Sequence, residues 1–165
     1  MCVKLFVYTI SQTLIKKNCI LFILFCVMCL ISCKKKAKQV VDDPIDYKTI
    51  NFNIYPNDPL YNKIKYAGGW MYINDQGING IIIYRQTETN TTADFIAIER
   101  TSTYYPNNAK AKVNVLTDNF TLKDTVSGST WQITNGAVLN GPATIALRFY
   151  STYYNSSTGT LNIKN

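Results

Sequence analysis

Apolar and polar residues alternate along much of the chain after residue 49, with the period of two that is typical of half-buried β-strands. Residues 50–55 (Ile-Asn-Phe-Asn-Ile-Tyr) alternate strictly, and the pattern returns at residues 112–116 and 119–122. Continuous apolar runs lie at residues 81–83 and 95–98. Such runs between turn residues are typical of strands that are covered on both faces. The short β-strand is therefore the dominant predicted element.

Turn-forming residues separate these segments about every eight to twelve positions. Further strands are predicted at residues 70–73, 131–134, 145–150 and 161–163. Asn135-Gly136 is a hairpin signal, and Asn57 or Asp58 can cap a single helical turn at residues 60–64. The pattern gives about nine or ten strands and no long helix. We therefore predict an all-β domain at residues 49–165, built as a small antiparallel β barrel or sandwich.

The residues before this domain follow a different pattern, first basic and then apolar. Lys16 and Lys17 precede an apolar run of thirteen residues at positions 19–31. A run of that length is too short to span a bilayer, which takes about 20 residues, and it matches the apolar region of a secretory signal peptide. Residues 1–15 precede a typical basic region, so either translation begins later or that region is extended. We predict that residues 1–32 are a signal peptide.

The apolar run ends in Leu30-Ile31-Ser32-Cys33, which resembles the lipobox of bacterial lipoproteins. The resemblance implies a diacylglycerol on the Cys33 sulfur, cleavage before Cys33, and acylation of the new amino terminus, for example with palmitate. Several acyl chains hold a protein at a membrane essentially permanently. The open alternatives are an ordinary signal peptide with a coincidental cysteine, and an uncleaved anchor. We expect an exported protein that is anchored to the cell envelope, at the outer membrane, through Cys33.

The formal net charge of +7 is unevenly distributed along the chain. Four lysines follow Cys33 directly, and residues 33–48 form a charged segment with Pro44 and no apolar period, which predicts a linker. From Ile50 onward, the chain has nine Lys or Arg residues and seven Asp or Glu residues. Nucleic-acid binding requires many phosphate contacts from a clustered basic face, and two scattered excess charges do not supply one. We therefore predict no nucleic-acid partner.

Cysteine and histidine usage restricts the chemistry of the domain. All five cysteines occur in the first 33 residues, and the chain has no histidine. The commonest general base and the commonest neutral metal ligand are therefore missing. The segment Ser127-Gly128-Ser129 lacks the glycine pattern of a nucleophile elbow, and the two acids near the loops, Glu99 and Asp124, are weak candidates for a glycosidase pair. We expect a protein that is not an enzyme and has no cofactor.

Several fragments of the predicted domain match one family in order and spacing. The matching stretches are residues 68–72 (Gly-Gly-Trp-Met-Tyr), 80–85 (Gly-Ile-Ile-Ile-Tyr-Arg), 95–100 (Phe-Ile-Ala-Ile-Glu-Arg) and 140–143 (Asn-Gly-Pro-Ala), followed by Leu147 and Tyr150. Together they resemble the Rieske-like domain of small lipoproteins from Bacteroidota. The resemblance covers most of the chain after Cys33 and implies a β barrel or sandwich of Rieske-like type.

The resemblance also implies two loops that would hold an iron-sulfur cluster, since a Rieske centre takes two cysteine and two histidine ligands. In this chain Ser102 and Tyr104 occupy the ligand positions of the first loop, and Asp124 and Ser127 those of the second. Hydroxyl groups are poor ligands for iron at neutral pH. A hard divalent ion on Asp124 is conceivable, but one carboxylate rarely suffices. The resemblance therefore implies a degenerate domain without its [2Fe–2S] cluster.

These observations favour a lipid-anchored binding or structural module. Tyr104 and Tyr105, in the first loop, are a candidate binding surface for a protein or a glycan. The simpler interpretation of the tyrosines is that they pack on half-buried strands. The alternative function is an accessory or docking subunit of an envelope redox or electron-transfer complex, with the metal centre in a partner.

Overall fold

The computed structural model describes residues 48–165, which contain ten β-strands and two short 3-10 helices. The predicted signal peptide, Cys33 and nearly all of the linker lie outside the described residues. The elements are β1 (Asn51–Ile54), η1 (Pro59–Ile64), β2 (Trp70–Ile73), β3 (Ile81–Arg85), η2 (Thr92–Asp94), β4 (Phe95–Glu99), β5 (Val113–Val115), β6 (Thr121–Asp124), β7 (Thr130–Gln132), β8 (Val138–Asn140), β9 (Phe149–Asn155) and β10 (Thr160–Lys164).

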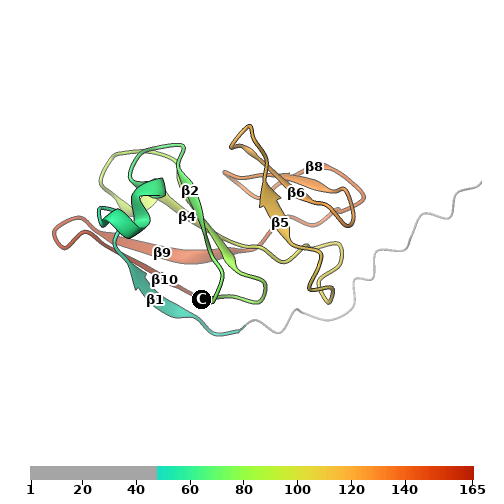
Figure 1. Ribbon diagram of the computed structural model, residues 1–165, viewed down its shortest axis with the longest axis horizontal. Helices are drawn as coiled ribbons and strands as arrows, with labels where there is room; N and C mark the ends of the chain where they lie inside the picture. Colours follow the sequence, from blue (N-terminus) through green and yellow to red (C-terminus); the bar gives the residue numbers. More distant parts are fainter. Residues whose placement is uncertain (1–47) are drawn as a thin grey trace, which may run out of the picture. The chain divides into compact units, whose positions relative to one another are not determined.

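The strands form two antiparallel sheets (Figure 1). One has six strands in the order β1-β10-β9-β4-β3-β2, and the other has four in the order β5-β6-β7-β8. The first and last strands pair with each other, from Asn51 with Lys164 to Ile54 with Leu161. This arrangement confirms the predicted all-β class and the small antiparallel barrel or sandwich. Across residues 48–165, no helix is long and apolar enough to cross a bilayer.

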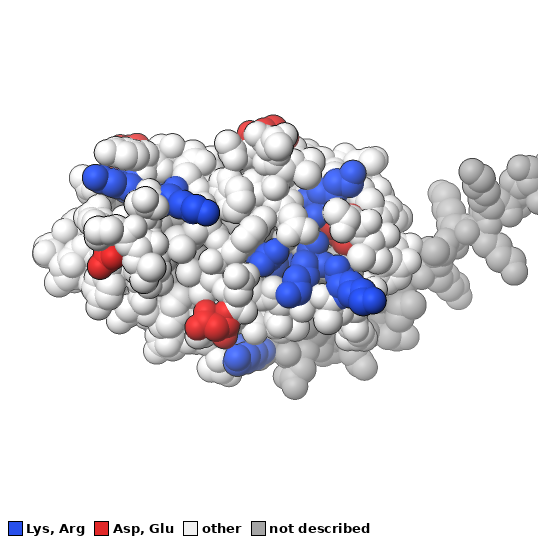
Figure 2. Space-filling model, viewed as in Figure 1, with Lys and Arg blue, Asp and Glu red and all other residues white. Residues whose placement is uncertain are grey.

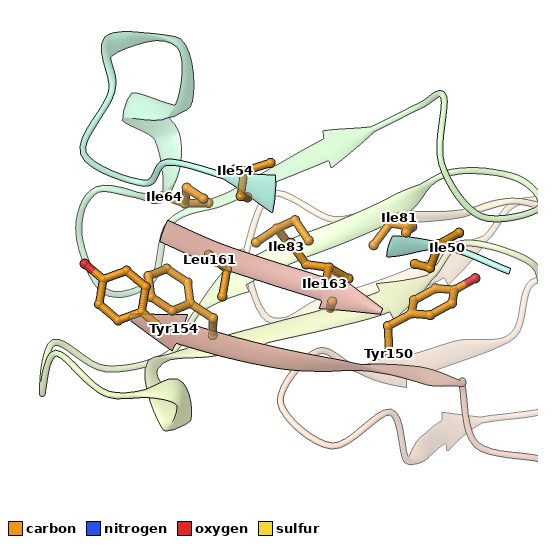
Figure 3. Close-up of a cluster of buried hydrophobic side chains, with 11 residues drawn as sticks. Ile50, Ile54, Ile64, Ile81, Ile83, Tyr150, Tyr154, Leu161 and Ile163 are labelled. Carbon is orange, nitrogen blue, oxygen red and sulfur yellow. The ribbon is translucent and has the colours of Figure 1, made fainter. Parts of the chain in front are cut away.

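The first hydrophobic core lies on one face of the six-stranded sheet (Figure 3). It takes Ile50 and Ile54 from the alternating first segment, Ile81 and Ile83 from β3, and Ile163 from β10. The polar residues between Ile50 and Ile54 point the other way, because successive side chains of a strand face opposite sides of the sheet. The alternation in the sequence therefore fixed which face of β1 is buried.

A second core lies on the opposite face of β3 and β4. Ile82 and Ile98 pack there with residues of the four-stranded sheet, among them Leu122 and Trp131. Ile82 and its two neighbours in β3 are fully buried, which confirms the prediction that the apolar run is covered on both faces. The strands β3 and β4 are thus shared by two cores. The first loop toward the smaller sheet begins directly after β4.

The predicted helical turn is confirmed, whereas one predicted strand begins later than expected. The helical turn is present as η1, with Pro59 at its start and the Asp58 carboxylate accepting from the Leu60 amide at 2.8 Å. The predicted strand at 145–150 begins only at Phe149. Its first part leaves the sheet because the Ile145 carbonyl accepts hydrogen bonds from side chains of other segments instead of from a neighbouring strand.

Candidate functional site

The candidate site is built from three connections at one end of the four-stranded sheet. The first loop, residues 100–112, joins β4 to β5 and is closed by a bridge between Thr101 and Lys112. Within it, the Ser102 amide donates to the Ala111 carbonyl at 3.0 Å, and the Ser102 hydroxyl accepts from the Tyr104 amide at 3.3 Å. Ser102 is fully buried. The first predicted ligand position therefore serves to shape this loop.

Tyr104 and Tyr105 do not form the exposed pair that was predicted. Tyr104 is buried in the second core, with 6 % of its surface exposed, whereas Tyr105 is 41 % exposed. Their rings meet edge to face, with centroids 4.4 Å apart. Burial, and then the neighbouring Tyr105 hydroxyl, raise the pKa of Tyr104. The prediction of a surface made by both rings is wrong for Tyr104, because its ring packs in the second core.

The second loop, residues 124–129, is organised by the buried carboxylate of Asp124. One carboxylate oxygen accepts from the Val126 amide at 2.8 Å, and the other accepts from the Ser127 amide at 3.3 Å and from the Ser127 hydroxyl at 2.7 Å. The Ser127 hydroxyl also lies 3.0 Å from that of Ser129. The two predicted ligand positions of this loop are therefore hydrogen-bonded to each other.

The third loop, residues 141–147, connects the other two. Its Ala143 amide donates to the Ser129 hydroxyl of the second loop at 2.9 Å. Its Ile145 carbonyl accepts from the Thr103 hydroxyl of the first loop at 2.7 Å and from the Trp131 indole at 3.0 Å. The structure thus brings the two predicted ligand loops together at one end of the smaller sheet, here called the three-loop end.

The buried carboxylate of Glu99 supports the base of the first loop. The sequence did not identify it as a structural group. Glu99, at the end of β4, accepts from the amides of Ile78 and Asn79 at 2.9 and 3.1 Å. It also accepts from the Thr101 amide and hydroxyl at 3.0 and 2.8 Å, and from the Tyr150 hydroxyl at 2.6 Å. The available signal was an acidic residue that ends an otherwise apolar strand, which is unusual unless the charge has partners.

Arg100 joins the first loop to both sheets. Its guanidinium lies 3.8 Å from the Tyr72 ring centroid and donates to the side-chain oxygens of Asn74 and Asn114 at 2.9 and 2.8 Å. It also donates to the Val113 carbonyl at 3.2 Å. Burial lowers the pKa of Arg100, and the neighbouring Tyr72 and Glu99 oppose this effect. The contacts fix the position at which the first loop leaves β4.

The polar groups of the two predicted ligand loops form hydrogen bonds mainly within these loops and with the third loop. Among residues 48–165, no group of three or more Asp, Glu, Cys or His side chains is arranged to hold a metal ion. The Ser127 hydroxyl directs its proton to Asp124, which holds the loop closed. Comparison of the chain with family models, with curated proteins and with solved structures finds no match. The residues of the chain are therefore the basis for assigning a function.

Proposed function

We propose that this chain is a lipid-anchored protein of the cell envelope whose β domain is a non-redox binding or structural module of Rieske-like type. The anchor is assigned to Cys33 because residues 30–33 match a lipobox and follow a signal-peptide pattern. The observation that carries the non-redox assignment is the set of residues in the two predicted ligand loops. Ser102, Asp124 and Ser127 hold hydroxyl and carboxylate groups that make hydrogen bonds within the loops, and Tyr104 packs into the second core.

The residues present do not fit a [2Fe–2S] cluster, which takes two thiolates and two imidazoles in a Rieske centre. The Tyr104 ring packs into the second core and so cannot turn toward the other loop without leaving it. The oxygens of Asp124 accept hydrogen bonds from Val126 and Ser127. Binding iron here would require breaking these contacts and would supply no sulfur ligand in exchange.

The three-loop end also presents apolar side chains to solvent, which supports a binding role. Tyr105, Val126 and Ile145, one from each loop, are 41 %, 46 % and 43 % exposed. Loops that are held by a rigid scaffold are where binding residues concentrate. The same exposed end would serve the alternative, an accessory subunit that docks on a redox complex. Co-purification with a redox partner would favour that alternative.

The test is to purify the mature chain, residues 33–165, from its membrane without added metal. We expect a folded, colourless protein without bound iron in elemental analysis. Intact mass should show the lipid, and the Cys33→Ser variant should lose both the lipid mass and the partition into detergent. Iron in stoichiometric amount, with the visible absorption of a [2Fe–2S] centre, would overturn the non-redox assignment. Wild-type protein without added lipid mass would overturn the anchor.

A further inference from the structure

Three lysines project from the three-loop end. Lys110 lies in the first loop, Lys112 at its bridge with Thr101, and Lys123 in β6 directly before the second loop. Figure 2 shows basic side chains gathered on the side of the domain where Figure 1 places β5 and β6. Positive charge is therefore concentrated at this end of the described domain.

Strand register explains why two of these lysines share a face. Asn114 of β5 pairs with Lys123 of β6, and Lys112 lies two residues before Asn114. Alternate residues of a strand face the same side, so both lysines lie on one face of the sheet. The opposite face carries Val113 and Leu122, which are fully buried in the second core. The lysines therefore point away from the core.

Among the described residues, 48–165, no ion pair cancels the charges of these lysines. The salt bridge between Arg85 and Asp94 lies elsewhere in the domain and includes none of them. Asp124 is next to Lys123 in the sequence but is buried beneath the second loop, where it accepts from Val126 and Ser127. Asp124 therefore does not lie beside Lys123 on the surface, although the two are adjacent in the sequence.

The exposed apolar side chains lie at the same end of the sheet as this charge. Tyr105 is in the first loop with Lys110, and Val126 is in the second loop, which follows Lys123, whereas the third loop, with Ile145, carries none of the three lysines. The loops that carry Tyr105, Val126 and Ile145 are joined by the Thr103–Ile145 and Ser129–Ala143 hydrogen bonds. Apolar side chains flanked by lysines fit the interface of an anionic bilayer. There the apolar groups enter the boundary between headgroups and acyl chains, and the ammonium groups stay with the phosphates.

We infer that the three-loop end docks on an anionic phospholipid surface. Lys110, Lys112 and Lys123 face the headgroups, and Tyr105 and its apolar neighbours enter the interface. The inference rests on the proposed function, since the anchor on Cys33 supplies the membrane. Residues 34–47 span at most about 50 Å when extended, so the domain stays close enough for weak contacts to orient it. Charge complementarity with apolar insertion favours lipid over an acidic protein, and three lysines are few for nucleic acid.

The test uses the mature chain with Cys33→Ser, so that binding does not depend on the anchor. Its partition is measured on vesicles of phosphatidylcholine alone and with about a fifth phosphatidylglycerol. We expect preference for the anionic vesicles and loss of it in about 0.5 M salt. The lysines of residues 34–38 contribute equally in every variant.

Replacing Lys110, Lys112 and Lys123 with Gln should weaken partition about 100-fold, since each lysine near the surface contributes about fivefold. The matched control is the triple replacement of Lys63, Lys65 and Lys164. This control removes the same charge from other parts of the domain, since Lys63 is in η1, Lys65 follows η1 and Lys164 is in β10. It should change the partition by no more than a few-fold. Equal losses in the two triple variants would overturn the inference, because long-range charge alone would explain them.

The apolar contribution is tested with Val126→Ser and, separately, Tyr105→Ser. Both should weaken binding severalfold, whereas Tyr153→Ser, at a 60 % exposed position of β9, should not. Thermal unfolding establishes that each variant is folded. If Tyr105→Ser disturbs the packing of Tyr104, Val126→Ser still tests the apolar contribution to binding. If the chain shows no preference for anionic vesicles, the proposed docking surface is overturned. Binding to DNA or to polyglutamate without such a preference would overturn it as well. Absence of lipid mass on the wild-type protein overturns only the anchor.

Discussion

Replacing Glu99 with glutamine preserves the size of the side chain and removes its charge where five hydrogen bonds converge. One carboxylate oxygen accepts from the Ile78 amide and the Tyr150 hydroxyl. The other accepts from the amides of Asn79 and Thr101 and from the Thr101 hydroxyl. A glutamine that keeps the latter three bonds directs its NH₂ group at the first two donors. The Tyr150 hydroxyl can turn to accept, but the Ile78 amide can only donate.

The cost follows from that geometry. A buried donor without a partner costs about 1–3 kcal/mol, and hydrogen bonds to a charged group contribute about 1.5–3 kcal/mol against about 1 kcal/mol for neutral ones. Removing the desolvation penalty of the buried charge offsets part of the loss. We expect Glu99→Gln to lower the free energy of unfolding by about 3 kcal/mol. Tyr150→Phe, which removes the 2.6 Å bond to Glu99, should cost about 1.5–3 kcal/mol.

The assay is urea unfolding followed by fluorescence, with the slope of the transition compared between variants. The control is Glu88→Gln. Glu88 is exposed and accepts one bond, from the Ala67 amide at 2.7 Å, so its replacement should change the free energy of unfolding by less than about 0.5 kcal/mol. If Glu99→Gln costs no more than Glu88→Gln, the carboxylate does not support the first loop as argued.

Three further predictions concern acid sensitivity, the second loop and the turn beside Glu99. Burial raises the pKa of Asp94, but hydrogen bonds from Thr89 and Thr87 outweigh it and lower the pKa to about 2. A depressed carboxyl pKa stabilises the fold above the ordinary value of 3.8, so about 1–2 kcal/mol should be lost as the pH falls from about 4 to 2, and Asp94→Asn should flatten this dependence in unfolding titrations. Ser127→Ala removes a 2.7 Å bond to Asp124 and should cost about 1–2 kcal/mol in urea unfolding, whereas the exposed Ser156→Ala should cost almost nothing. Gly77 has a φ of 74°, and a Cβ there would lie 2.6 Å from a Glu99 oxygen, so Gly77→Ala should lower the midpoint of thermal unfolding and an unchanged midpoint would contradict the packing.

Periodic segments were predictable because burial and backbone period act together in them. Ile81, Ile82 and Ile83 could be assigned to a doubly covered strand because a short apolar run between turn residues is typical of such strands, and all three are fully buried. Ile50 and Ile54 followed from alternation alone. In β1 a shift of one position would move the apolar set into solvent, so there the alternation also carries the register.

Loop residues were less predictable because their directions depend on single hydrogen bonds between distant segments. Tyr104 and Tyr105 are adjacent and chemically identical, yet one packs in the core and the other faces solvent. The Tyr104 ring is buried by residues of distant segments in the second core, and no periodicity encodes these contacts. The apolar stretch at 145–150 likewise resembles a strand until the Thr103 and Trp131 side chains, 42 and 14 positions away, take the Ile145 carbonyl.

The charge distribution illustrates the same limit. From Ile50 onward the chain has nine basic and seven acidic residues, which by count is nearly neutral. Asp94, Glu99 and Asp124 are buried, as are Arg85 and Arg100, so seven basic and four acidic residues remain at least partly exposed. A buried carboxylate keeps its charge, but it cannot make direct contact with a partner, so the charged side chains that a partner touches at this end are the lysines. The contact surface of the three-loop end is therefore more basic than its sequence suggests, because Asp124, beside Lys123 in the chain, is directed inward to close the second loop.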